Sequence, residues 1–300
     1  MSDNRELHCP VESVSCVGGK VGPVDGSTQS HWRVGPEHNG RMSTDARFEQ
    51  LIAEGNSEPT EGWDFSWFDG RATEERPSWK YSRELRNRIA RSNAIFDVQT
   101  GGGERLAEVL SEVDAGSLRI AASESWIPNI ALAQHNLTRY GASIVEIPDD
   151  ADFPFPDNSF DLVSSRHPTI TLWKEIARVL EPGGTYFSQQ VGAGTNRELA
   201  DFMMGSQPIS EVRSTQRAVD AATSAGLQVI DLKEESLSIE FYDVAAVVYF
   251  LRKVIWTVPN FSIESYKVRL KEMHEHIESV GSFQSHSERF LIEAFKPASN

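Results

Sequence analysis

The segment AIFDVQTGGGERLAEVL, residues 94–110, constrains the fold of this chain more than any other. An apolar run with strand character ends at Asp97, glycines occupy positions 101–103, and a helical pattern begins directly after them. A glycine turn between a strand and a helix forms a binding corner at the carboxyl edge of a sheet, because glycines let the backbone pass close beneath a ligand. We therefore expect a ligand site at this corner.

Strand and helix patterns alternate from residue 94 onward, which is typical of a mostly parallel sheet with right-handed crossovers. The expected fold is therefore α/β, a Rossmann-like seven-stranded sheet with helices on both faces. The predicted strands are 94–98, 118–122, 143–147, 160–164, 185–191, 228–234 and 290–295, and the predicted helices between them are 103–112, 129–140, 170–180 and 212–225.

The chain divides into three predicted regions. Residues 1–41 lack periodicity and are rich in Gly, Ser, Pro, Asn and His, so we expect a disordered tail. Residues 42–91 are predicted to form a helical and aromatic cap, and Met42 is a second candidate beside Met1 for the start of translation. Residues 92–300 form the main predicted domain, with a helical insertion at about 242–282 before the last strand.

The residues around the glycines select among three ligand classes that use such a corner. A phosphate-binding loop would end in Gly-Lys-Ser/Thr, but Glu104 follows the glycines, and a dinucleotide loop needs a glycine where Leu106 stands. Carboxylates at Asp97 and Glu104 would repel a pyrophosphate and suit a cation. S-adenosylmethionine carries a sulfonium and an ammonium group and no phosphate, so the pattern favours this methyl donor.

Further acidic residues follow the next two strands. Glu124 ends LRIAASE, where a carboxylate can accept hydrogen bonds from two ribose hydroxyls. Its alternative role is that of a helix N-terminal carboxylate favoured by the helix dipole. Asp149 or Asp150, after the third strand, can accept a bond from the adenine amino group.

Four segments resemble, in order and spacing, the motifs of class I S-adenosylmethionine-dependent methyltransferases of the small-molecule, quinone-biosynthesis kind (methyltransferase type 11). They are IFDVQTGGGE, AASESW, DDADFPFPDNSFDLV and ARVLEPGGTYFSQQVG, and the resemblance covers residues 90–235, about half the chain. It implies an antiparallel last strand and S-adenosylmethionine as cofactor. It also implies a donor-binding set made of Asp97, Gly101, Gly102, Gly103, Glu124, Asp149 and Asp150.

Gln99 departs from the family pattern. The family reads Asp-x-Gly-x-Gly, whereas this chain reads Asp-Val-Gln-Thr-Gly. If the backbone at this position requires a positive φ, a glutamine costs about 1 kcal/mol there relative to glycine. Whether this substitution weakens donor binding is left open by the sequence.

The candidate acceptor side lies after the fourth and fifth strands. Methyl transfer depends mainly on positioning and the exclusion of water, and a base helps only where the nucleophile must lose a proton. His167 is the candidate base, with a plain loop histidine as the alternative. Arg166, Gln189, Trp63 and Trp67 are candidate substrate contacts, and the tryptophans form either a lid or part of a core.

Composition limits the function further. A net charge of −15 argues against nucleic acid, no apolar run approaches membrane-spanning length, and two early cysteines exclude a disulfide framework, so we expect a cytoplasmic protein that binds no metal. The predicted function is a methyltransferase (EC 2.1.1.-) that acts on a small-molecule acceptor by in-line transfer. The alternatives are an RNA-directed methyltransferase and a non-catalytic nucleoside-binding or regulatory protein. A homo-oligomer is left open.

Overall fold

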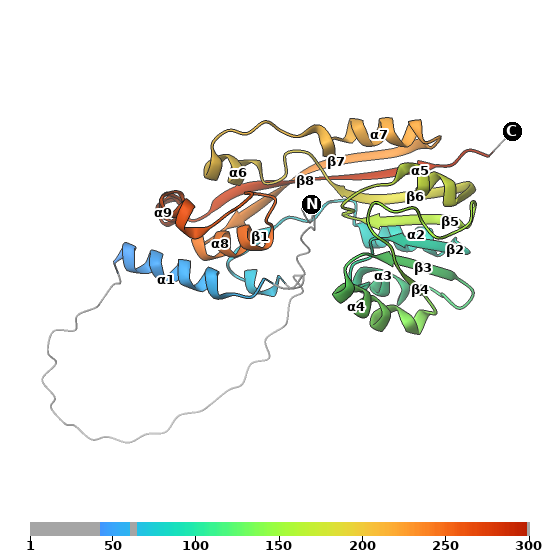
Figure 1. The fold of residues 1–300 in the computed structure, drawn as a ribbon, viewed down its shortest axis with the longest axis horizontal. Helices are drawn as coiled ribbons and strands as arrows, with labels where there is room; N and C mark the ends of the chain where they lie inside the picture. Colours follow the sequence, from blue (N-terminus) through green and yellow to red (C-terminus); the bar gives the residue numbers. More distant parts are fainter. Residues whose placement is uncertain (1–42, 61–64, 299–300) are drawn as a thin grey trace, which may run out of the picture.

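The computed structural model describes residues 43–60 and 65–298 and contains one mixed sheet. The strand order is β1-β7-β8-β6-β5-β2-β3-β4 (Figure 1). The parallel strands are β2 (Ala94–Val98), β3 (Arg119–Glu124), β4 (Ser143–Glu146), β5 (Phe160–Arg166) and β6 (Leu180–Val191). Strand β8 (Phe283–Phe295) pairs antiparallel with both β6 and β7 (Gln228–Phe241), so β7 runs in the same direction as β6. The short β1 (Ala72–Glu74) pairs antiparallel with β7.

The expected α/β class and the antiparallel last strand are confirmed, with two differences in the strands. The sheet has eight strands rather than seven, because residues 72–74 pair with the far end of β7 as an additional edge strand. In addition, β6, β7 and β8 are each several residues longer than predicted. The pairing of β7 with β8 continues from Ser236 opposite Glu288 to Phe241 opposite Phe283, beyond the last residue of β8 that pairs with β6.

Helices cover both faces of the sheet where it is parallel. On one face, α2 (Tyr81–Ile89), α3 (Glu104–Leu110) and α4 (Ile127–Leu137, followed by the turn η2, Thr138–Tyr140) bury their apolar sides. On the other face lie α5 (Trp173–Val179) and α7 (Thr215–Ser224, preceded by the turn η3, Glu211–Arg213). Strand β2 is buried along its whole length, which explains why all its residues but Asp97 are apolar.

A second lobe, the cap, is built on the protruding end of the β7–β8 hairpin (Figure 1). It contains α1 (Thr44–Ser57), the turn η1 (Ser66–Phe68), α6 (Arg197–Met204), α8 (Val244–Lys253) and α9 (Ile263–Val280). Ser43 accepts a bond from Ala46 N at 3.2 Å and caps α1. The helices α8 and α9 occupy the segment where the helical insertion is predicted.

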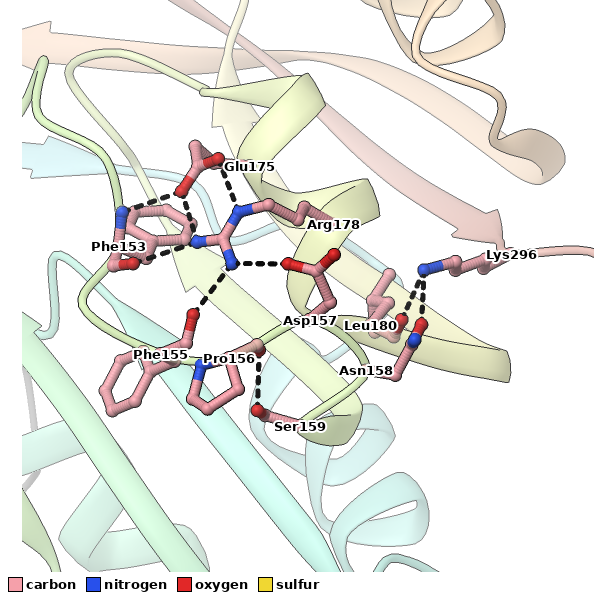
Figure 2. Close-up of polar contacts among 10 residues, drawn as sticks. All are labelled: Phe153, Phe155, Pro156, Asp157, Asn158, Ser159, Glu175, Arg178, Leu180 and Lys296. Carbon is pink, nitrogen blue, oxygen red and sulfur yellow. Dashed lines mark hydrogen bonds and ion pairs between the residues drawn. The ribbon is translucent and has the colours of Figure 1, made fainter.

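The loop from β4 to β5 is held by one arginine of α5 (Figure 2). Arg178 donates to the carbonyls of Phe153 at 2.9 Å and Phe155 at 2.7 Å, and to Asp157 at 2.9 Å. Glu175 completes the cluster with two bonds from Arg178, at 2.6 and 2.7 Å, and a bond from Phe153 N at 2.7 Å. Hydrogen bonds therefore link the segment FPFPDNS to the segment EIARVL, which follows it in the motif order.

Candidate functional site

The glycine turn lies at the carboxyl edge of the sheet, between β2 and α3. Gly101 has a φ of +65° and Gly103 a φ of +77°, so both adopt the left-handed conformation that favours glycine. A Cβ at Gly103 would approach Leu137 Cδ1 to 2.8 Å, whereas a Cβ at Gly101 would meet nothing within 4 Å. The third glycine of the run therefore serves packing, and the first leaves open space above the backbone.

Asp97 is buried at the end of β2. Its Oδ1 accepts a bond from Ser164 Oγ at 2.6 Å, and the parallel register sets these two residues side by side. Burial raises the pKa of Asp97 to about 6, against the lowering effect of hydrogen bonds from Ser164 and Thr100. The carboxyl group is thus mostly ionised at neutral pH in a site with little water.

Glu124, at the end of β3, lies beside the glycine turn. Its Oε2 accepts a bond from Gly101 N at 2.9 Å, and its Oε1 accepts bonds from Ser125 N at 3.0 Å and Trp126 N at 2.9 Å. A carboxylate offers about four acceptor positions, so these three bonds leave Oε2 able to accept from a further donor. Both sequence interpretations find support here, since the carboxylate faces the glycine turn and also binds amides that precede α4.

Gln99 has a φ of +56°, so its backbone adopts the positive-φ conformation that costs a glutamine more than a glycine. Its side chain crosses to the loop after β5. There Oε1 accepts a bond from Thr169 N at 2.6 Å, and Nε2 donates to Ile170 O at 2.9 Å. These bonds, which we call the Gln99 bridge, tie the loop between β2 and α3 to the loop that follows β5. They also offset the backbone strain.

The structure separates the two candidate adenine carboxylates. Thr169 Oγ1 donates to Asp149 Oδ2 at 2.6 Å, so Asp149 belongs to the same edge as the Gln99 bridge. Asp150 is exposed. Sequence reasoning missed Thr169, whose only signal is its place in the loop after the fourth strand.

A cavity of about 450 Å³ lies between the cap and the parallel part of the sheet. Arg166, His167 and Gln189 line it at the carboxyl ends of β5 and β6. The cap side contributes Phe65, Phe68, residues 72–77 and Leu237, and the opposite wall comes from α2 and α3. Tyr81 lines the cavity and donates from its hydroxyl to Ser165 O at 3.0 Å, next to the strand end that carries Asp97.

Of the two candidate tryptophans, Trp67 lies away from the cavity. Trp67 packs edge-on against Tyr249 in the cap, with ring centroids 5.0 Å apart, and it is not among the residues that line the cavity. Trp63 lies outside the described residues, as does the predicted tail at 1–41. The neighbouring Phe65 and Phe68 do line the cavity.

Two hydrogen bonds through Gln189 determine the tautomer of His167. Trp79 Nε1 donates to Gln189 Oε1 at 2.8 Å, and because an indole nitrogen can only donate, the Gln189 amide orientation is determined. Gln189 Nε2 therefore donates to His167 Nε2, which lies 2.8 Å away and must accept. The neutral imidazole carries its proton on Nδ1, so it presents a donor rather than a base at that atom.

Basic side chains gather at the inner wall of the cavity. Arg289 is 7% exposed and donates to Glu74 at 2.9 Å. Burial, together with the charges of Arg105 and Arg289, lowers the pKa of Arg166 to about 10, which still leaves it cationic at neutral pH. Arg289 lies in the last strand, far along the chain from Arg105 and Arg166, and no local motif marks it.

Known proteins with similar sequences are methyltransferases. Residues 96–188 match the methyltransferase domain family. A malonyl-[acyl-carrier protein] O-methyltransferase of Marinomonas sp. (strain MWYL1) is 22% identical over 219 residues, which is 68% of this chain and 80% of that protein. Cycloartenol-C-24-methyltransferase 1 of Oryza sativa subsp. japonica is 33% identical over 106 residues, only 29% of this chain and 31% of that protein.

A solved structure of a candidate methyltransferase from Bacillus halodurans has the same fold, with a TM-score of 0.50 and 17% identity over 72% of this chain and 98% of that one. Residues 96–188 therefore belong to the methyltransferase domain family. This match and the fold together support a class I S-adenosylmethionine-dependent methyltransferase, with S-adenosylmethionine as its cofactor. Among residues 43–60 and 65–298, no helix combines the length and the apolar character that crossing a bilayer requires.

The residues at the sheet edge fit this cofactor. Gly101 leaves open space above its backbone, Asp97 supplies a buried carboxyl group for a cationic ligand, and Glu124 keeps an acceptor position beside the glycine turn. The Gln99 bridge crosses the same edge, where the family usually has a glycine.

Proposed function

We propose that this methyltransferase acts on a small-molecule acceptor held in the cavity between the cap and the sheet. The observation that carries the proposal is the position of that cavity. It lies at the carboxyl ends of β5 and β6, and its far wall includes α3, the helix that begins at the glycine turn. An acceptor there would lie next to the donor corner, which a single-step transfer requires.

The donor-binding roles follow from the same edge. Asp97, Gly101, Gly102, Gly103, Glu124 and Asp149 are the residues that we propose to hold S-adenosylmethionine, which supplies an electrophilic methyl group when bound. Asp150, which is exposed, is the weaker of the two adenine candidates. The cap contributes by excluding water from the acceptor, since in-line transfer gains most from positioning and desolvation.

His167 is proposed to position the acceptor. Its Nε2 lone pair is engaged by Gln189, so accepting a proton there requires that bond to break, and its Nδ1 is buried. This arrangement suits an acceptor atom that is already unprotonated at neutral pH. Arg166 and Gln189 complete the proposed acceptor wall.

Titration calorimetry with S-adenosylmethionine tests the donor site. Glu124→Ala removes a carboxylate that would accept ribose hydroxyls, so we expect donor binding to weaken by about 1–3 kcal/mol. Glu278→Ala changes an exposed carboxylate on α9 and is the matched control. Unchanged affinity in Glu124→Ala would remove Glu124 from the site.

Turnover separates the enzyme from its alternatives. Formation of S-adenosylhomocysteine with small-molecule acceptors supports the proposal. Donor binding without turnover on any acceptor class favours a non-catalytic nucleoside-binding protein, a reading to which Gln99 in place of glycine lends weight. Turnover on RNA alone would contradict the small-molecule acceptor, which the net charge of −15 and the location of the cavity between two lobes favour.

A further inference from the structure

The cavity between the lobes has a local positive charge in an acidic protein. Seven basic and five acidic side chains line it, although the whole chain carries a net charge of −15. An excess of one sign in a partly enclosed cleft focuses the electrostatic potential there and attracts ligands of the opposite charge. The lining therefore favours an anionic ligand over a cationic or neutral one.

The acidic side chains of the lining are largely engaged by neighbours of their own. Glu112 pairs with Arg86 and Glu108 pairs with Arg105, both at the helical wall of the cavity. Glu75 accepts a bond from Ser238 N at 3.0 Å, and Glu74 binds Arg289 at 2.9 Å. These pairings offset the charges of Arg86, Arg105 and Arg289, so the positive excess belongs to the lining as a whole. Arg166, at the end of β5, and Arg289, in β8, contribute guanidinium groups to it.

Like charges held together in a partly buried place oppose one another, and the lowered pKa of Arg166 reflects its burial and the neighbouring Arg105 and Arg289. A bound anion would relieve this repulsion. Guanidinium groups present paired donors that match the two oxygens of a carboxylate or phosphate. Next to them, the cap supplies the apolar side chains of Phe65, Phe68 and Leu237.

We propose that the cavity binds a small organic acid, with its carboxylate or phosphate on Arg166 and Arg289 and its apolar body against Phe65, Phe68 and Leu237. This inference rests on the proposed function, because it names the chemical class of the acceptor that the cavity takes. The neutral tautomer of His167 agrees with it, since an anionic nucleophile needs no base.

Paired probes of equal shape test the proposal in the full-length protein. Benzoate and its neutral isostere benzamide are titrated by calorimetry at fixed ionic strength, and phenyl phosphate is the third probe. We expect benzoate or phenyl phosphate to bind at least about tenfold more tightly than benzamide. The stronger of the two anions identifies carboxylate or phosphate as the preferred group. Equal affinity for all three probes would overturn the proposal.

Replacing arginines that line the cavity tests whether they bind the anion. Arg166→Met is expected to weaken anion binding about tenfold or more and to leave benzamide binding unchanged. Arg105→Met, a partly exposed position on α3, gives a second reading if Arg166→Met does not fold. Arg139→Met, exposed on the turn after α4, is the matched control. Unchanged anion binding in both cavity variants would refute the assignment.

The donor titration keeps this test separate from that of the proposed function. Each variant is also titrated with S-adenosylmethionine. Retained donor binding with lost anion preference in Arg166→Met supports the acceptor assignment specifically. If the wild-type protein binds the donor but not the anions, only this inference is overturned. If it prefers the anions but turns over no acceptor, only the proposed function is overturned.

Discussion

At the residue scale, Gln99 shows how a side chain can offset a strained backbone. Its φ of +56° costs a glutamine about 1 kcal/mol relative to glycine, and the two bonds of the Gln99 bridge act against that cost. The motif pattern showed that this position departs from the family. It did not show the partner loop, because Thr169 and Ile170 are some 70 residues away.

Two substitutions at Gln99 separate strain from bonding. Gln99→Ala keeps the strain and loses the bridge, so its free energy of unfolding should fall by about 1–3 kcal/mol. Gln99→Gly loses the same bonds but relieves the strain, and should be about 1 kcal/mol more stable than Gln99→Ala. Urea denaturation of both variants gives the difference. Equal stabilities would mean that the backbone at this position carries no strain.

Asp97 gives the protein a pH-dependent stability. Its folded pKa of about 6 lies above the ordinary value of 3.8, so between these pH values the folded state keeps a proton that the unfolded state releases. The free energy of unfolding therefore falls as pH rises through this window, by about 3 kcal/mol for a shift of this size. We expect Asp97→Asn, which cannot ionise, to be more stable than the wild type at pH 7 by about 1–3 kcal/mol.

The same substitution has a defined pH profile. The advantage of Asp97→Asn should shrink toward pH 4, where the wild-type carboxyl group is protonated in the folded and increasingly in the unfolded state. Chemical denaturation across this range is the measurement. A constant difference between the two proteins at all pH values would contradict the raised pKa of Asp97.

At the element scale, the β4–β5 loop depends on Arg178. One guanidinium group binds two loop carbonyls, Asp157 and Glu175 (Figure 2). We expect Arg178→Met to lower the free energy of unfolding by about 2 kcal/mol, because the loop carbonyls lose a charged donor. Arg178→Lys should recover only part of this, since an ammonium group cannot reproduce the fork.

Thermal and urea denaturation measure this effect, with Lys174→Met as the control. Lys174 is exposed on the same helix, so its replacement tests for a general effect of losing a cation from α5. Equal stability of Arg178→Met and Lys174→Met would show that the loop does not depend on the arginine.

The elements of the sheet differ in how well local pattern predicts them. Strand β2 is buried throughout and apolar except for Asp97, and it has its predicted bounds. The extension of β7 carries a period-two signal in Leu237, Ile239 and Phe241, all buried, between polar neighbours. It was missed because the alternating stretch follows the acidic run at 234–235. Strand β1 is three residues long and exists only through its pairing with β7, so its own sequence carries almost no signal.

At the scale of the whole molecule, the two candidate sites were unequally predictable. The donor corner is assembled from residues that each follow a strand, so the motif order sufficed to bring Asp97, Gly101 and Glu124 to one edge. The cavity needs Arg289 beside Glu74, a pair 215 positions apart in the chain. Such a contact depends on the docking of the cap, which local patterns do not encode.

The long hairpin of β7 and β8 also sets a rule for how this architecture can vary. Both lobes are attached to the same two strands, and Leu237 reaches the cavity from the stretch between them. One residue added to each strand would reverse the faces and turn Leu237 away from the cavity. Two added residues would keep every face and lengthen the span by about 7 Å. Relatives that accommodate larger acceptors in this way should therefore differ by even numbers of residues in each arm of the hairpin.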